Sequence, residues 1–182
     1  MTLSTDNYKA AVAERSRIEH ECDYDALTGL YSRQAFFRVC EELFEKPDTL
    51  RHAALMMTDL DNLKTINDTY GHDWGDVYLR QTARSLQQGS PSGAVAARLS
   101  GDEFLLLLKN IDLEVALDKL EQVKRQLAAV KVGSQGKALS VSMGVYVPED
   151  DDLAYRDVFV KADEALYRAK RSGKNRICVH GR

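Results

Sequence analysis

Residues 94–108 read Ala-Val-Ala-Ala-Arg-Leu-Ser-Gly-Asp-Glu-Phe-Leu-Leu-Leu-Leu, two strand-like runs separated by the short segment Ser100-Gly101-Asp102. A glycine in so tight a corner between two apolar runs predicts a β-hairpin. Two adjacent carboxylates, Asp102 and Glu103, lie at its tip. We therefore expect acidic side chains at one edge of a sheet.

A second acidic strand end lies upstream of this hairpin. The apolar run 53–60 is typical of a buried central strand, and Asp59 and Asp61 lie at its carboxyl end. Neighbouring strands could bring these acids to the hairpin tip, where they would repel one another unless a cation held them. Hard oxygen ligands favour Mg²⁺. Each acid alone is equally well explained as a solvated turn residue, but two clusters at two strand ends favour a metal site.

The remaining pattern predicts an α+β fold. Apolar spacing predicts helices over 33–44, from 62, and over 73–88, 113–130 and 153–171, and strands at 138–147 and 176–179. This order is typical of an antiparallel-rich sheet with helices packed on one face. A thin apolar stripe over residues 8–22 favours a separate helix. We divide the chain into an N-terminal linker helix, 1–22, and one domain, 23–182.

Charge and composition exclude several classes of function. The chain has 25 Lys and Arg against 28 Asp and Glu, and no basic block, which disfavours nucleic acid or an anionic membrane as partner. Its 3 cysteines are isolated and lack metal-ligand spacing, which disfavours a disulfide framework or a zinc site. No apolar run approaches the roughly 18 residues of a membrane-spanning helix. We expect a cytoplasmic domain without membrane contact.

The segment Arg98-Leu-Ser-Gly-Asp-Glu-Phe104 resembles the signature hairpin of the GGDEF family, the bacterial diguanylate cyclases. Three other segments resemble family motifs in the same order. They are the opening motif Asp25-Ala-Leu-Thr-Gly-Leu30, the metal and guanine segment 59–76, and the closing phosphate segment 167–176. The resemblance extends over about residues 23–179, nearly the whole chain.

The resemblance implies a ferredoxin-like βαββαβ core of the nucleotide cyclase and polymerase-palm type, with a mostly antiparallel sheet. It implies one GTP per domain and a homodimer of facing domains, in which each 3′-hydroxyl attacks the other α-phosphate to give cyclic di-GMP and pyrophosphate. The implied cofactor is Mg²⁺, two ions per active site, with Mn²⁺ as a substitute. A sensory domain upstream in a longer protein is also expected.

The resemblance also implies roles for single residues. Asp59, the Leu60 carbonyl and Asp102 would hold the metal. Asp102 would also be the candidate base for the 3′-hydroxyl, and Lys64 would neutralise charge that develops on the phosphates. The implied substrate-binding residues are Asn67 and Asp76 on the guanine edge, His72 and Ser100 near the nucleotide, and Lys170 and Lys174 at the β- and γ-phosphates. Taken singly, these residues are equally well explained as solvated polar side chains or helix-end residues.

Some positions depart from the family pattern. Ser100 replaces the usual first glycine, which would add strain if the position required a left-handed backbone, and Lys174 replaces an arginine. We expect weakened or conditional activity rather than none. The alternative is a catalytically silent domain that binds GTP or a protein partner and acts in regulation. Pro91 and Ala94 replace the Arg and Asp of the family's product-inhibition motif, so that feedback site is expected to be missing.

Overall fold

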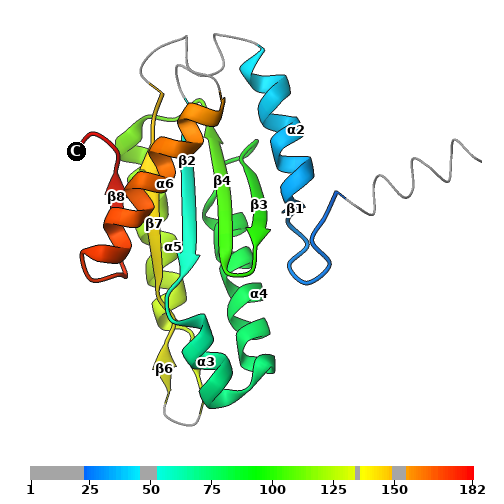
Figure 1. Cartoon of the computed structure of the whole chain (residues 1–182), viewed down its shortest axis with the longest axis vertical. Coiled ribbons are helices and arrows are strands. Elements are labelled where there is room, and N and C mark those ends of the chain that lie inside the picture. The colour runs from blue at the N-terminus through cyan, green and yellow to red at the C-terminus, as the bar shows by residue number, and fades with distance from the viewer. Residues whose placement is uncertain (1–22, 46–52, 134–135, 149–154) are drawn as a thin grey trace, which may run out of the picture.

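A six-stranded sheet in the order β1-β3-β4-β2-β7-β8 forms the centre of the computed structural model, which describes residues 23–45, 53–133, 136–148 and 155–182 (Figure 1). The strands are β1 (Tyr31–Ser32), β2 (Ala53–Leu60), β3 (Val95–Ser100), β4 (Glu103–Lys109), β7 (Val141–Tyr146) and β8 (Ile177–Val179). A separate ribbon pairs β5 (Lys131–Val132) with β6 (Lys137–Ala138). The helices are α2 (Arg33–Phe44), α3 (Leu63–Tyr70), α4 (His72–Gly89), α5 (Leu113–Ala129) and α6 (Tyr155–Arg171).

The sheet is mixed and mostly antiparallel. Strand β2 lies at its centre and pairs antiparallel with β4 on one side and with β7 on the other. The short outer strands β1 and β8 pair parallel with β3 and β7. The predicted α+β fold with a mostly antiparallel sheet is therefore confirmed. The predicted linker helix 1–22 lies outside the described residues.

The helices cover both faces of the sheet, so the prediction of helices on one face was wrong. Helices α2 and α6 lie against one face, and α4 and α5 lie against the other (Figure 1). The cause is visible in β2, whose successive side chains point to opposite faces. Ala54 and Met56 join the core beneath α4 and α5, while Leu55 and Met57 join the core beneath α2 and α6.

Local signals in the sequence set several helix ends. Ser32 caps α2, since its hydroxyl accepts a hydrogen bond from the Ala35 amide at 3.3 Å. Gly71 separates α3 from α4 and has φ 91°, a conformation that residues other than glycine rarely adopt. Within the described part of the chain, no helix has the length and apolar character needed to cross a membrane.

We predict that Gly144→Ala destabilises the fold because helix α6 crosses β7 at this glycine. A Cβ at Gly144 would lie 2.1 Å from the Leu166 amide nitrogen and 2.3 Å from the Ala162 carbonyl oxygen. Backbone atoms of a packed helix cannot move aside singly, so we expect the free energy of unfolding to fall by about 1–3 kcal/mol or more. Urea unfolding measures the change.

Gly89→Ala is the matched control for this substitution. A Cβ at Gly89 would come within 2.8 Å of a methyl group of Val123, which is a single side-chain atom and not the backbone of a packed helix. Its cost should be clearly smaller than that of Gly144→Ala. Equal costs for the two variants would contradict the close backbone approach as the reason for Gly144.

Candidate active site

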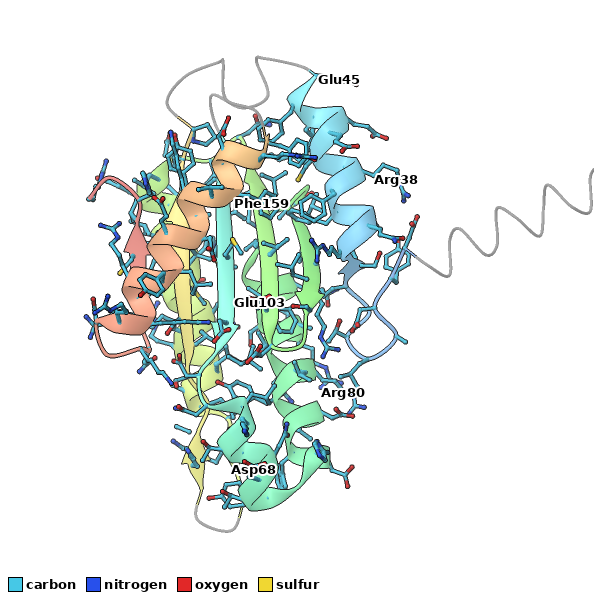
Figure 2. All side chains as sticks on the ribbon, in the orientation of Figure 1. Arg38, Glu45, Asp68, Arg80, Glu103 and Phe159 are labelled. Carbon is cyan, nitrogen blue, oxygen red and sulfur yellow. The ribbon has the colours of Figure 1, made fainter. Side chains whose placement is uncertain are left out.

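The end of β2 and the tip of the β3–β4 hairpin form one acidic edge of the sheet. Asp59 lies opposite Glu103 in the antiparallel register, and the Leu60 amide donates a 3.1 Å hydrogen bond to the Asp102 carbonyl. Glu103 lies toward the end of the sheet from which α3 and Asp68 extend, away from Glu45 (Figure 2). The predicted meeting of the two acidic strand ends is therefore present in the fold.

Asp59 is largely enclosed at this edge, with its side chain 13% exposed. Burial, together with the negative charges of Asp102 and Glu103, raises the pKa of Asp59 above its usual value. A hydrogen bond from Lys170, whose Nζ lies 2.6 Å from Asp59 Oδ2, offsets part of this rise. The edge thus concentrates negative charge that a cation would stabilise.

Asp61 has a structural role. It does not belong to the acidic edge, where the sequence pattern placed it together with Asp59. Its carboxylate is buried, and accepts hydrogen bonds from the Ser142 hydroxyl at 2.7 Å and from the Asn175 amide at 2.9 Å. These bonds connect β2 to β7 and to the loop after α6. That loop carries Lys174, whose Nζ lies 2.8 Å from Asn62 Oδ1. Asp61 therefore holds in place the loop that carries Lys174, a residue predicted to bind the substrate phosphates.

A cleft of about 530 Å³ lies between α3, α4 and the hairpin. Five of the predicted site residues line it, together with Arg98, Gly75 and Gly101; the five are Lys64, Asn67, His72, Asp76 and Asp102. These side chains come from three separate elements that only the fold brings together. Lys170 and Lys174 lie outside this lining: Lys170 pairs with Asp59 at the acidic edge, and Lys174 donates a hydrogen bond to Asn62.

Another hollow, of about 580 Å³, lies between α6 and the residues that follow β8, His180 and Gly181. It includes Lys170 but none of the other residues predicted to bind substrate or metal. The cleft beside the hairpin is therefore the better candidate for the active site.

Two predicted guanine ligands face the cleft from different helices. Asn67 lies in α3, and its Oδ1 is buried without a hydrogen-bond partner among the described residues. Asp76 lies in the first turns of α4 and is partly exposed, with Arg80 Nη2 3.4 Å from its carboxylate. Asp76 therefore offers an accessible acceptor in the cleft, whereas the Asn67 Oδ1 is covered and unpaired beside Gly75.

Ser100 does not strain the hairpin. The left-handed residue of the turn is Gly101, with φ 38°, whereas Ser100 is not among the described residues with positive φ. The Ser100 hydroxyl donates a 2.7 Å hydrogen bond to Glu103. The substitution of the usual glycine therefore adds a contact within the turn without a backbone cost.

Arg98 is a structural residue of the site to which sequence reasoning assigned no role. Its guanidinium donates to the Gly101 carbonyl through Nε at 3.1 Å and Nη2 at 2.8 Å, and its Nη1 lies 3.2 Å from Asp25 Oδ1. Asp25 also accepts hydrogen bonds from the Thr28 amide and hydroxyl. Arg98 thus connects the opening motif to the hairpin tip. An arginine two residues before the turn was the only signal in the sequence.

We predict a pH-dependent contribution of Asp25 to stability. Burial acts to raise the pKa of Asp25, but hydrogen bonds from Thr28 and the charge of Arg98 outweigh it and hold the pKa below its usual 3.8. A carboxyl group with a lowered folded-state pKa stabilises the fold above the unfolded-state value, and this contribution is lost as pH falls through the folded-state value. Asp25→Asn should therefore cost about 1–2 kcal/mol near neutral pH.

The measurement is urea unfolding of the parent and Asp25→Asn at about pH 7 and about pH 3. The difference between the two chains should shrink at the lower pH. Asp118→Asn, which alters an exposed acid of α5, should show no such trend. A difference that stays constant between the two pH values would contradict the role of the Asp25 charge.

Comparison with known proteins finds one family model, described as "Diguanylate cyclase, GGDEF domain", that matches residues 22–176. The chain is 35% identical over 167 residues to the diguanylate cyclase DgcM of Escherichia coli, covering 88% of this chain and 39% of DgcM. It is 30% identical over 167 residues to a diguanylate cyclase of Vibrio cholerae, covering 91% of this chain and 52% of that protein. The chain therefore spans about two fifths to one half of these relatives.

A solved structure is similar over almost the whole chain. It is the coiled coil and GGDEF domain of DgcB from Caulobacter crescentus in complex with c-di-GMP. The TM-score is 0.84 at 28% identity, and the match covers 97% of this chain and 95% of that one.

Proposed function

This chain belongs to the GGDEF-domain family of diguanylate cyclases, and we propose that it condenses two GTP molecules into cyclic di-GMP. The observation that carries the proposal is the cleft in which Lys64, Asn67 and Asp76 converge beside the hairpin carboxylate Asp102. In the reaction, the 3′-hydroxyl oxygen of each GTP forms a bond to the α-phosphorus of the other. The bond from that phosphorus to pyrophosphate breaks, so two pyrophosphates leave and two protons are released.

The acidic edge fits a divalent metal ion. Within the described residues, no group of three or more His, Cys, Asp or Glu side chains is arranged to hold a metal by itself. Mg²⁺ would therefore be held by Asp59, Asp102 and the Leu60 carbonyl, together with the phosphates of the substrate. The register that sets Asp59 opposite Glu103, and the backbone hydrogen bond that holds Asp102 beside Leu60, support this fit. When bound, such an ion neutralises phosphate charge and aligns the reacting oxygens.

The protein side chains would bind and orient the nucleotide. Asn67 and Asp76 would read the guanine edge, since a carboxylate accepts hydrogen bonds from the ring N–H and amino groups that distinguish guanine from adenine. Lys64 would stabilise charge on the phosphates, and Asp102 would accept the proton of the 3′-hydroxyl. The substrate-contacting residues beyond these would be His72, Ser100, Lys170 and Lys174.

Each domain would bind one GTP in this cleft, so that ring closure would require two domains face to face. We propose a homodimer as the active species. A tether on the N-terminal side of the domain would raise the local concentration of the second domain. Because the chain spans only part of its relatives' length, an upstream sensory domain in a longer protein is part of this proposal.

The usual product-feedback site would be missing. Pro91 and Ala94 occupy the positions of its Arg and Asp, and they line a small hollow of about 200 Å³ whose described lining contains no charged side chain. Such a surface offers no counter-charge to the phosphates of cyclic di-GMP.

Catalysis is favoured over the alternative of a silent GTP-binding or protein-interaction module. Ser100, a main reason for that alternative, has an unstrained backbone and a hydrogen bond to Glu103. Lys174 keeps a positive charge at the phosphate end of the site and is positioned by the loop that Asp61 anchors.

The direct test is turnover of GTP with Mg²⁺, scored for cyclic di-GMP and pyrophosphate. We predict that Asp102→Ala and Asp59→Ala each lower turnover by about 100-fold or more, because each removes a ligand of the metal and Asp102→Ala also removes the candidate base. Asp118→Ala is the control and should retain parental turnover. Near-parental activity in either site variant would contradict the proposed metal site, and GTP binding without product in the parent would favour the silent module.

We predict that Asp76→Ala lowers the preference for GTP over ATP by about tenfold or more, because the variant can no longer accept hydrogen bonds from the guanine edge. Calorimetric titration of both nucleotides against parent and variant measures the preference. Asp73→Ala, which alters an exposed acid in the first turn of the same helix, is the matched control. Equal discrimination by parent and Asp76→Ala would place base recognition elsewhere.

A further inference from the structure

We infer that Gly75 is a positioning residue for base recognition, because the space left by its missing side chain is occupied by the amide of Asn67. An ideal Cβ at Gly75 would lie 1.9 Å from Asn67 Oδ1 and 2.9 Å from Asn67 Cγ. No residue with a Cβ can share that volume with the amide. The inference rests on the proposed function, in which Asn67 reads guanine.

The turn between α3 and α4 brings these two residues together. Gly71 ends α3, donates its amide to the Asn67 carbonyl at 2.9 Å, and allows the chain to reverse. The first turn of α4 then passes directly over the Asn67 side chain. Gly75 is buried there, and both Gly75 and Asn67 line the cleft.

The backbone at Gly75 does not require glycine. Its φ is not in the left-handed region, unlike that of Gly71, and it lies within a regular helix. Alanine is intrinsically the better residue at such a position. The reason for glycine must therefore be the space beside the helix, and the atoms in that space belong to Asn67.

The position of the Asn67 side-chain oxygen beside Gly75 is not explained by a hydrogen bond within the protein. This Oδ1 is the one buried side-chain nitrogen or oxygen atom without a partner in the described part of the chain. A buried polar atom that is left unpaired is unfavourable for folding. This placement is explained if it holds the cleft-lining part of the Asn67 side chain in position for a ligand.

The predicted effect of adding a Cβ is therefore specific. The atoms in its way are the end of a flexible side chain, which can rotate away at low cost to the fold. Rotation would remove the Asn67 amide from the place where it meets the base. Gly75→Ala should thus impair guanine recognition more than stability, the reverse of what Gly144→Ala should do.

The test is a double-mutant cycle with Asn67, measured as equilibrium binding of α,β-methylene GTP and of its adenine counterpart, neither of which can release pyrophosphate. We expect Gly75→Ala to weaken binding of the guanine analogue by about tenfold, and binding of the adenine analogue by less than about twofold. In an Asn67→Ala background, the same substitution should change binding by less than about twofold. Gly89→Ala, the same change elsewhere in α4, is the control.

The outcomes separate the two proposals. A parent chain that shows no preference for the guanine analogue would overturn the proposed base site and this inference with it. A parent that prefers guanine, with Gly75→Ala binding as tightly as the parent, would overturn the inference alone. Gly75→Ala could also weaken binding of the guanine analogue equally in the parent and Asn67→Ala backgrounds. That result would indicate general damage to the helix and would overturn the inference as well.

Thermal unfolding of the same four chains completes the cycle. If the Gly75→Ala chain is unfolded but the double variant with Asn67→Ala is folded, the result would support a steric clash between the added Cβ and the Asn67 side chain. Unfolding of Gly75→Ala in both backgrounds would overturn it, because the obstruction would then lie elsewhere than in the Asn67 side chain.

Discussion

The antiparallel register between β2 and β4 is the constraint on which the site depends, because it brings carboxylates from two strands to one edge of the sheet. Asp59 lies opposite Glu103, and Asp102 is held beside Leu60 by a backbone hydrogen bond. The resulting repulsion would oppose folding if these acids were buried deeply. They lie instead at the edge of the sheet, where Lys170 balances part of their charge and the proposed metal ion would balance more.

The sequence predicted the elements and the acidic edge well, because both follow from local pattern. The tight turn at Gly101 and the apolar run of β2 carry strong signals of strand and hairpin. Helices on the second face were missed, although the unbroken apolar run Ala53–Met57, from which a buried strand was predicted, contained the information: a strand covered on one face only would alternate with polar residues. The helix periodicity shows which side of a helix is apolar, but not which face of the sheet it covers.

The cleft could be assembled from the sequence only by resemblance. Asn67 and Asp76 come from two helices, and the hairpin follows more than twenty residues later, so no periodicity places them together. Arg98 and Gly75 escaped sequence reasoning for a different reason. Their roles lie in a distance to one atom of another element, to Asp25 in one case and to Asn67 in the other. Residue type alone does not report such distances.

Asp59 and Asp61, at the end of the same strand, have different roles: Asp59 lies at the candidate active site, and Asp61 stabilises the surrounding structure. Both are aspartates next to Leu60, and chemistry alone does not distinguish them. Asp59 pairs with a partly exposed lysine side chain at the acidic edge, whereas Asp61 is buried and accepts hydrogen bonds from Ser142 and from the backbone of Asn175. A carboxylate that is buried and already accepts a hydrogen bond on each oxygen is less accessible to a metal than one at the open edge of the sheet. The hydrogen-bond partners of each acid, rather than its place in a motif, therefore decide which one can serve the substrate.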